Sequence, residues 1–253
     1  MVQSVDRTLD ILEALASADD DLSLGQLCAT LELPLGTIHR LLSTLIARGY
    51  AAQDGQTRRY GPGPKLLEIA ARATSHSRFS LRRLAQPYLR TLTDATGETS
   101  NLIVLQGNEI VYIEQVTSAR LVHMFTAVGQ RAPLYCTGGG KAILAGLPDQ
   151  QVEAYLVTAQ LRPWTASTIT DRERFWQELL HTRQRGYAVD DEEREEGVRC
   201  VAAPIFDHTG ACVAAISISG PTSRVTLPRV DQLGPQLCQA AAAYSAQLGY
   251  NVS

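Results

Sequence analysis

The stretch LPLGTIHRLLSTLIARGY, residues 33–50, has two different faces when it is wound into an α-helix. Apolar residues recur at i, i+3, i+4 and i+7, which makes a stripe that a core can bury. They are Ile38, Leu41, Leu42 and Leu45. The opposite face is small and polar and leaves room for close approach to another surface. It carries Gly36, Thr37, His39, Arg40, Ser43 and Thr44. A helix of this kind, entered through a tight turn from another short helix, fits the major groove of DNA.

Two short helices are expected before this stretch. Ser4 is placed to cap a first helix whose apolar face extends to about residue 16. Ser23, with Gln26 three residues later, is a capping-box pattern that opens a second helix. A turn at residues 32–34 then leads into the two-faced helix, so the pattern predicts a helix-turn-helix.

A small hairpin is expected after Gly49, which ends the two-faced helix. Residues 50–53 and 57–60 can pair across Asp54-Gly55-Gln56, with Arg58 and Arg59 beside the tip. Three helices followed by a hairpin predict a winged helix-turn-helix.

The predicted DNA-binding domain covers residues 1–63. The run Gly61-Pro62-Gly63-Pro64 marks its boundary, and residues 64–79 are expected to form a connector helix. Residues 1–65 hold six basic residues against eight acidic ones, so this is not a basic domain. Four of the basic residues surround the two-faced helix and the hairpin, whereas three acids gather at residues 19–21. Few phosphate contacts per copy imply weak binding, which a dimer on two half-sites would remedy.

Composition excludes several classes of protein. The 253 residues are 45% hydrophobic, enough to bury a core without covalent staples. No apolar run is long enough for a membrane span and the N-terminus lacks a signal-peptide pattern, so we expect a soluble cytoplasmic protein. Five cysteines without a C-x-x-C pair argue against a disulfide framework and against a zinc site.

The second domain, residues 80–253, mixes helices with hairpins. Ser80 is expected to cap a helix that ends at Gly97, and Thr170 with Glu173 to open another that ends near residue 185. The other expected helices begin at about residues 138, 149 and 228. Strands are expected at residues 101–106, 109–116, 121–126, 200–206 and 211–219. Because βαβ alternation is missing, the pattern predicts an α+β domain with a mainly antiparallel sheet.

The chain resembles the IclR family of bacterial transcription regulators along essentially its whole length. In the first domain the resemblance rests on VDRTLDILEAL, LPLGTIHRLLSTLIARGY and RRYGPGPKLLEIA. In the second it rests on GETSNLIVL, AVGQRAPLYCTGGGKAILAGL, RGYAVDDEEREEGVRCVAAPIFD and VAAISISGPTSRVT. It implies a GAF-like effector-binding fold for the second domain, and the likeness is closest to members that sense glyoxylate-type small acids.

The resemblance also implies which residues contact DNA and effector. The candidate DNA-binding residues are Leu35, Gly36, Thr37, His39, Arg40, Ser43, Thr44, Arg58 and Arg59. The candidate effector-binding residues are Gly138, Gly139, Asp190, Cys200, Ser217 and Ser219, with Leu121 and Met124 as an apolar wall. A purely structural helical domain, and solvated hairpin arginines, are the alternatives on the DNA side.

The residues themselves support a polar pocket in the second domain. Strand alternation sends Ser217 and Ser219 to the face opposite Ile216 and Ile218. Glycines at the start of a helix expose backbone N–H groups that suit a carboxylate, although a tight turn also explains them. Serines in a strand are often merely solvated. An aspartate facing an acid is unfavourable unless it meets a hydroxyl, a hydrate or a shared proton.

Enzymatic interpretations find little support. TGGGKA is not a P-loop, because Tyr135 stands where the first glycine belongs and Ala142 replaces the Ser or Thr that holds magnesium. No spacing enforces a Cys–His nucleophile pair, and the five histidines have no metal-ligand pattern. We therefore expect no catalytic residues, no metal and no cofactor.

The function predicted from the sequence is ligand-responsive transcription regulation. Repression of a palindromic double-stranded DNA operator, relieved by a glyoxylate- or pyruvate-like 2-oxo acid, is the main hypothesis. Activation in response to an aromatic or other acid uses the same parts. A small-molecule enzyme or carrier with a vestigial helix-turn-helix is the third possibility. The expected assembly is a homodimer or, as a dimer of dimers, a tetramer, with no membrane partner.

Overall fold

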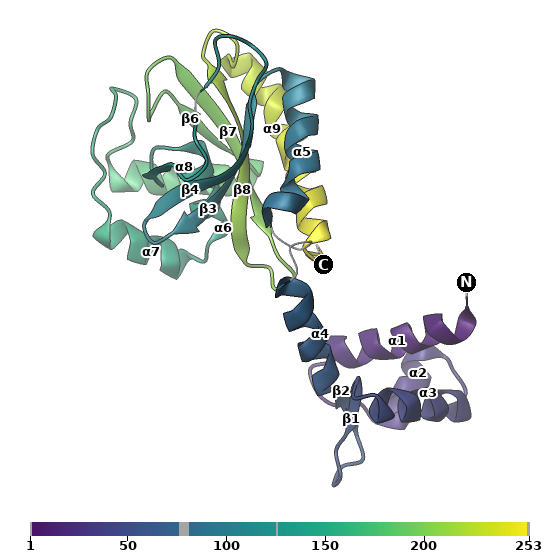
Figure 1. The fold of residues 1–253 in the computed structure, drawn as a ribbon. Helices are drawn as coiled ribbons and strands as arrows, with labels where there is room; N and C mark the ends of the chain where they lie inside the picture. The colour runs from purple at the N-terminus through teal and green to yellow at the C-terminus, as the bar shows by residue number, and fades with distance from the viewer. Residues whose placement is uncertain (1, 76–80, 125, 252–253) are drawn as a thin grey trace. The chain divides into compact units, whose positions relative to one another are not determined.

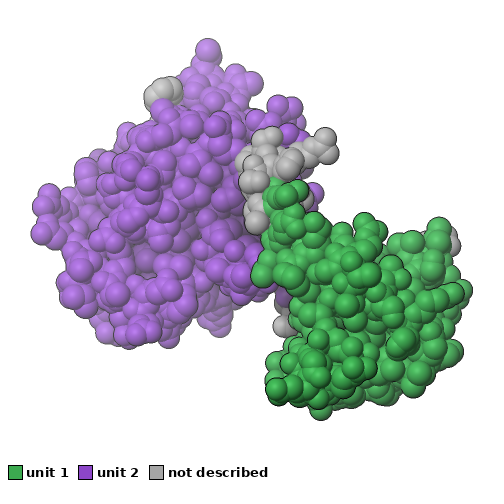
Figure 2. Space-filling model, turned by 60° about the horizontal axis from the view of Figure 1, so that its bottom comes forward, with its two compact units in different colours: residues 1–80 green, residues 81–253 purple. Residues whose placement is uncertain are grey.

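The computed structural model describes residues 2–75, 81–124 and 126–251. The chain divides into two compact units, Met1–Ser80 and Leu81–Ser253, which Figure 2 draws in green and purple. Each unit has a hydrophobic core of its own.

The first unit is a helix-turn-helix followed by a two-stranded wing. Its elements are α1 (Gln3–Ser17), α2 (Leu24–Leu31), α3 (Leu35–Ala47), β1 (Ala51–Gln53), β2 (Tyr60–Pro62) and α4 (Pro64–Ser75). The two-faced stretch forms α3, and its apolar stripe faces the core. Ile38, Leu42 and Leu45 are buried in one cluster with Ile11, Leu15 and Leu27, and the partly buried Leu41 packs against it. The predicted winged helix-turn-helix is confirmed.

The first two helix starts differ in how well they were predicted. The capping box at Ser23 is confirmed: its hydroxyl accepts from the Gln26 N–H, and the Gln26 side chain accepts from the Ser23 N–H. The prediction that Ser4 caps the first helix is wrong. The cap is Val2, which has no side-chain acceptor, and Ser4 lies inside the first turn.

The wing begins its second strand later than predicted. The expected return strand at residues 57–60 is replaced by β2, which begins at Tyr60. The Asp54 carboxylate accepts hydrogen bonds from the N–H groups of Gln56 and Thr57 and from the Thr57 hydroxyl. These bonds hold the chain in a turn, and Arg58 follows in the left-handed region with φ of 59°. The loop is therefore longer than a tight hairpin turn.

The second unit is a six-stranded antiparallel sheet with helices on both faces (Figure 1). Its helices are α5 (Leu81–Thr96), α6 (Gly138–Gly146), α7 (Asp149–Thr158), α8 (Arg172–Arg185) and α9 (Leu227–Gln247). Its strands are β3 (Thr99–Gln106), β4 (Glu109–Val116), β5 (Arg131–Pro133), β6 (Ala188–Asp191), β7 (Val198–Phe206) and β8 (Cys212–Pro221). The strand order is β5-β4-β3-β8-β7-β6, and every neighbouring pair is antiparallel. The predicted α+β class is confirmed.

Two expectations about this unit need correction, and a third concerns a residue outside the described ranges. No strand forms at residues 121–124 or at 126, whereas the short strands β5 and β6 were not predicted. The cap of α8 is Asp171, whose carboxylate accepts from the Arg174 N–H, and not Thr170. Ser80, the expected cap of α5, lies outside the described residues.

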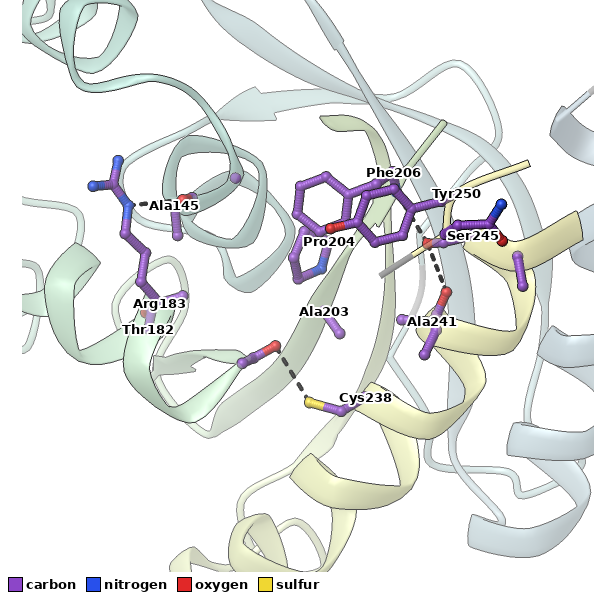
Figure 3. A pocket seen from close by; sticks show the side chains of 15 residues that line it. Ala145, Thr182, Arg183, Ala203, Pro204, Phe206, Cys238, Ala241, Ser245 and Tyr250 are labelled. Carbon is purple, nitrogen blue, oxygen red and sulfur yellow. Dashed lines mark hydrogen bonds between the residues drawn. The ribbon is translucent and has the colours of Figure 1, made fainter. Parts of the chain in front are cut away.

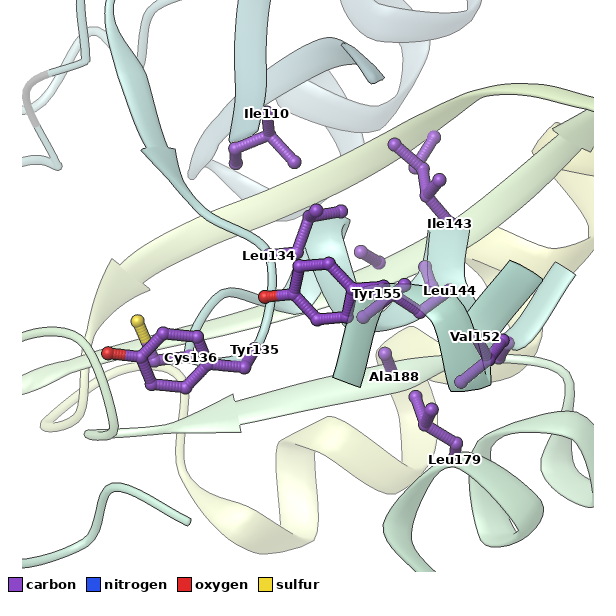
Figure 4. Packing of buried hydrophobic residues seen from close by; sticks show 14 of the residues in the cluster. Ile110, Leu134, Tyr135, Cys136, Ile143, Leu144, Val152, Tyr155, Leu179 and Ala188 are labelled. Carbon is purple, nitrogen blue, oxygen red and sulfur yellow. The ribbon is translucent and has the colours of Figure 1, made fainter. Parts of the chain in front are cut away.

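The sheet separates two cores, and β8 contributes to both. Ala214, Ile216 and Ile218 pack into the cluster that α5 and α9 cover. Ala215 faces the other cluster, which α6, α7 and α8 cover and which Figure 4 shows around Leu134, Ile143 and Leu179. The alternation predicted for β8 is therefore realised, and it places Ser217 and Ser219 on the α6 side.

Candidate DNA interface and effector site

The polar face of α3 lies on the surface of the first unit. Leu35, Gly36, His39, Arg40, Ser43 and Thr44 are exposed, and Thr37 is half-buried. The hydroxyls of Ser43 and Thr44 donate to backbone carbonyls one turn earlier, at His39 and Arg40. A Cβ added at Gly36 would meet nothing within 4 Å, so no packing inside the chain requires a glycine there. Gly36, Ser43 and Thr44 are small residues, and Arg40 is an exposed cation on this face.

The two wing arginines are not equivalent. Arg59 donates to the Asp21 carbonyl at 2.8 Å, and the bridge between Leu22 and Tyr60 joins the same segments. The acidic loop at residues 19–21 therefore lies against the base of the wing. Arg58 is exposed at the tip and uses its carbonyl, not its guanidinium, in the bond with Gln53.

Sheet register brings four of the predicted effector residues together. Asp190 on β6 is opposite Cys200 on β7, and Cys200 is opposite Ser219 on β8. Residues opposite one another in an antiparallel sheet share a face, so these side chains form a row across three strands. Ser217 lies two residues before Ser219 on the same face. The polar members are buried, with Asp190 5% exposed, Ser217 0% and Ser219 4%.

Gly138 and Gly139 lie beside this row at the first turn of α6. A Cβ at Gly138 would come within 2.9 Å of the Cys200 sulfur, and one at Gly139 would collide with Ile103. A larger residue at either position would force the Cys200 or Ile103 side chain to shift, so glycine favours the close approach of the helix to the sheet. The Thr137 hydroxyl accepts from the Gly140 N–H, whereas the Gly138 and Gly139 N–H groups have no acceptor among the described residues. They leave two donors at the positive end of a helix.

The predicted apolar wall is only partly assembled. Met124 is half-buried, and its carbonyl accepts from the hydroxyl of Thr99, the residue opposite Ser219 on β3. Leu121 is fully exposed and is not brought to the other candidate residues in this structure.

The electrostatics of the row keep its groups close to neutral. Burial raises the pKa of Asp190 to about 7, against the opposing effect of Lys141. Its Oδ1 accepts from the N–H groups of Glu193 at 2.8 Å and Arg194 at 3.3 Å. Burial also raises the pKa of Cys200 to about 11 and that of Cys136 to about 12. Both thiols are therefore protonated near neutral pH, which makes them inert as nucleophiles.

A buried ion pair contributes to the electrostatic environment of Asp190. Lys141 of α6 is completely buried and pairs with Glu193, with Glu178 at 3.7 Å. Glu193 Oε2 has no partner among the described residues, and burial raises the pKa of Glu193. Sequence patterns offered no signal for this pair, because its members are 52 residues apart.

Sequence reasoning also missed Asn101, which is completely buried on β3 opposite Ser217. Its Nδ2 donates to Ser217 Oγ at 3.2 Å and to Ser219 Oγ at 3.5 Å. The sequence signal for Asn101 was a polar residue in the run NLIVL, which hydropathy alone predicts to be a buried strand.

Two cavities lie away from this row. One, of about 560 Å³, is mainly apolar and lies between the end of α8 and α9 over β7, where Ala203 and Pro204 form its floor (Figure 3). The other, of about 510 Å³, is lined by charged side chains that include Lys141, Glu193 and Asp191. Neither is lined by Ser217, Ser219 or Cys200.

Grouped metal ligands and membrane spans are both missing from the part of the chain that is described. No cluster of three or more His, Cys, Asp or Glu side chains could hold a metal ion there. Among the same residues, no helix has the length and apolar character needed to cross a bilayer.

A winged helix-turn-helix joined to an α+β sheet domain with a buried polar row defines a class: DNA-binding regulators with a sensory domain. Residues 4–55 match the family model of the IclR helix-turn-helix domain, and residues 73–246 match that of the bacterial transcriptional regulator IclR C-terminal domain. The chain belongs to the IclR family of transcription regulators, which is not a family of enzymes.

Relatives share this organisation from end to end. The chain is 36% identical to the transcriptional repressor IclR of Escherichia coli, over 98% of this chain and 90% of that protein. It is also 36% identical to the regulator BhcR of Paracoccus denitrificans, over 96% and 86%. The crystal structure of the repressor BlcR of Agobacterium tumefaciens superimposes with a TM-score of 0.80 at 29% identity, covering 100% and 99%. This protein is thus a DNA-binding transcription regulator.

Proposed function

We propose that the protein is a repressor whose operator binding is modulated by a small carboxylate of the 2-oxo acid type. The observation that carries the proposal is the buried row of Asp190, Cys200 and Ser219 beside the free N–H groups at the start of α6. Several of the relatives are named as repressors, which supports the proposed sign of regulation.

The row offers a consistent set of partners for a small acid. The Gly138 and Gly139 N–H groups and the Ser217 and Ser219 hydroxyls can donate to a carboxylate or carbonyl oxygen. Because burial brings the pKa of Asp190 to about 7, its carboxyl group can carry a proton and donate a hydrogen bond to an oxygen of the effector. This removes the repulsion that an ionised aspartate would exert.

On the DNA side, the proposal assigns α3 to the major groove and Arg58 to a phosphate. A dimer would bring two copies of α3 to two half-sites. Its support is an apolar stripe at α1, where the N-cap Val2 and the helix residues Val5 and Leu9 are each at least half exposed. These residues share one helix face, and burying them against a second copy would remove apolar surface from water.

A gel-shift assay tests operator binding and the sign of regulation. The full-length protein should shift the DNA upstream of its own gene at moderate salt, and a scrambled duplex of the same composition should not be shifted. Loss of the shift on adding the effector would indicate repression relieved by ligand. Retention of the shift, with a reporter gene switched on, would indicate activation. No specific shift with or without ligand would rule out the proposed operator.

A thermal-shift screen tests the effector class. Glyoxylate, pyruvate and related 2-oxo and hydroxy acids are compared with benzoate-type aromatic acids. A ligand that binds only the folded state raises the melting temperature by mass action. Stabilisation by aromatic acids alone would contradict the proposed 2-oxo acid.

A further inference from the structure

One buried amide connects the effector row to the chain between β4 and β5. Asn101 is opposite Gln115 on β4 and opposite Ser217 on β8, so its side chain lies between theirs on the same face of the sheet. We call the described residues 117–124 and 126–130 the β4–β5 segment. Thr126 of this segment is buried and reaches the same amide.

Both ends of the amide are occupied. Asn101 Oδ1 accepts from Thr126 Oγ1 at 2.8 Å and from Gln115 Nε2 at 3.1 Å. Asn101 Nδ2 then points to the hydroxyls of Ser217 and Ser219. Thr117 donates in turn to Gln115 Oε1 at 3.3 Å, so the donors of the network run in one direction toward β8.

The direction of these hydrogen bonds determines whether the two serine hydroxyls act as donors or acceptors toward a ligand. A hydroxyl that accepts from Asn101 still has its own hydrogen to donate elsewhere. Within the chain both hydroxyls interact with the Cys200 thiol and lower its pKa, although burial outweighs them.

We propose that Asn101 is a positioning residue that makes Ser217 and Ser219 hydrogen-bond donors toward the effector and ties their orientation to the β4–β5 segment. The atom of the effector that faces β8 is then an acceptor, such as a carboxylate or carbonyl oxygen. The proposal deepens, and rests on, the effector site proposed above. Buried, fully satisfied networks of this kind hold one arrangement, because each missing bond leaves a polar group without a partner.

The segment that Asn101 holds is also anchored at its end, where the Gly129 N–H donates to the Tyr112 carbonyl at 2.7 Å and the Tyr112 N–H donates to the Gln130 carbonyl at 3.1 Å. Further bonds hold its first part. Thr99 donates to the Met124 carbonyl at 3.4 Å, Ser118 donates to the Gly97 carbonyl, and Arg224 donates to the Val122 carbonyl at 2.8 Å. Val122 and Val128 are more than half exposed. A ligand that reorients the serines would therefore alter the bond between Asn101 and Thr126, which lies between these anchors.

Hydrogen–deuterium exchange of the full-length protein separates this role from a merely structural one. In Asn101→Ala, peptides that span residues 117–130 should exchange about tenfold faster, because a lost hydrogen bond of about 1.4 kcal/mol is a factor of ten. Thr126→Val, which keeps Asn101 and the serines, should give a similar rise. Asn108→Ala is the matched control, since Asn108 lies exposed in the β3–β4 turn and its side chain bonds only Thr158 among the described residues. It should leave the segment unchanged.

Binding of pyruvate and glyoxylate, measured by calorimetry, tests the donor direction. Asn101→Asp keeps the acceptor bonds to Thr126 and Gln115 but has no N–H group, so the serines must donate to it. Exchange of the segment should stay near that of the wild type, while affinity falls about tenfold or more.

Three outcomes decide the proposal. Unchanged exchange in both Asn101→Ala and Thr126→Val would overturn it, whatever the ligand. Wild-type affinity in Asn101→Asp would overturn the donor assignment, and if that variant does not fold, Asn101→Ala serves in its place. If the wild-type protein binds neither acid, the proposed effector class is wrong, while the exchange comparison still decides whether Asn101 holds the segment.

Discussion

The two units carry their proposed functional residues in opposite environments. In the first unit the residues of α3 that face away from the core are exposed, and their hydroxyls bond only to the helix itself. In the second unit the candidate residues are buried, so each polar atom depends on a partner from another strand or helix. Substitutions on the exposed face should therefore leave the free energy of unfolding nearly unchanged, whereas substitutions in the buried row should lower it.

The largest expected effect is on the stability of the second unit. Lys141→Met should cost about 3–5 kcal/mol, because it leaves the buried Glu193 charge without its partner. Lys65→Met is the matched control: its pair with Glu68 is on the surface and should be worth about 0–1 kcal/mol. Urea unfolding measures both, and a loss in Lys141→Met no larger than in Lys65→Met would mean that water or rearrangement satisfies Glu193.

The next effect is on ligand binding. Ser217→Ala combined with Ser219→Ala should abolish stabilisation by the effector, since two hydrogen bonds to a charged group are worth about 1.5–3 kcal/mol each. DNA binding without ligand should stay intact, which gel shifts can check. A thermal shift equal to that of the wild type would place the effector elsewhere, for example in the charged cavity beside Lys141.

A smaller effect is expected on the exposed face. Arg40→Ala should weaken operator binding about tenfold or more per copy, given about 1–3 kcal/mol for a good base contact. The melting temperature and effector binding should not change, because Arg40 is exposed and packs against no core. Lower thermal stability in Arg40→Ala would show that α3 is built for packing rather than for contact with DNA.

The smallest effect is that of pH. Because the pKa of Asp190 is raised to about 7 in the folded protein, its carboxyl group loses its proton as the pH rises through 7. The unfolded state releases this proton near pH 4, so stability falls as the pH rises from about 4 to about 7 and levels off above that. Affinity for a carboxylate should fall severalfold between pH 6 and 8, and Asp190→Asn should remove that dependence. A pH-independent affinity in the wild type would exclude proton donation by Asp190.

Much of the fold could be read from local pattern. The period of Ile38, Leu42 and Leu45 predicts α3, and the alternation along β8 predicts which face Ser217 joins. Errors arose where local bonds compete with pattern: Asp54 holds a turn that delays β2, and Asp171 rather than Thr170 caps α8. The stretch 121–126 has strand-like residues, but no neighbouring strand forms ladder bonds with its described part.

By itself, the sequence determined the two-unit organisation, the exposed polar face of α3 and the residue types of the proposed effector row, because these depend on spacing along one segment. Only the tertiary structure decided that Asp190, Cys200 and Ser219 form a row, that Asn101 bonds both serines, and that Lys141 meets Glu193. The reason is physical. Register and burial arise from packing between segments far apart in the chain, and burial sets the protonation of Asp190 and the direction of each hydrogen bond.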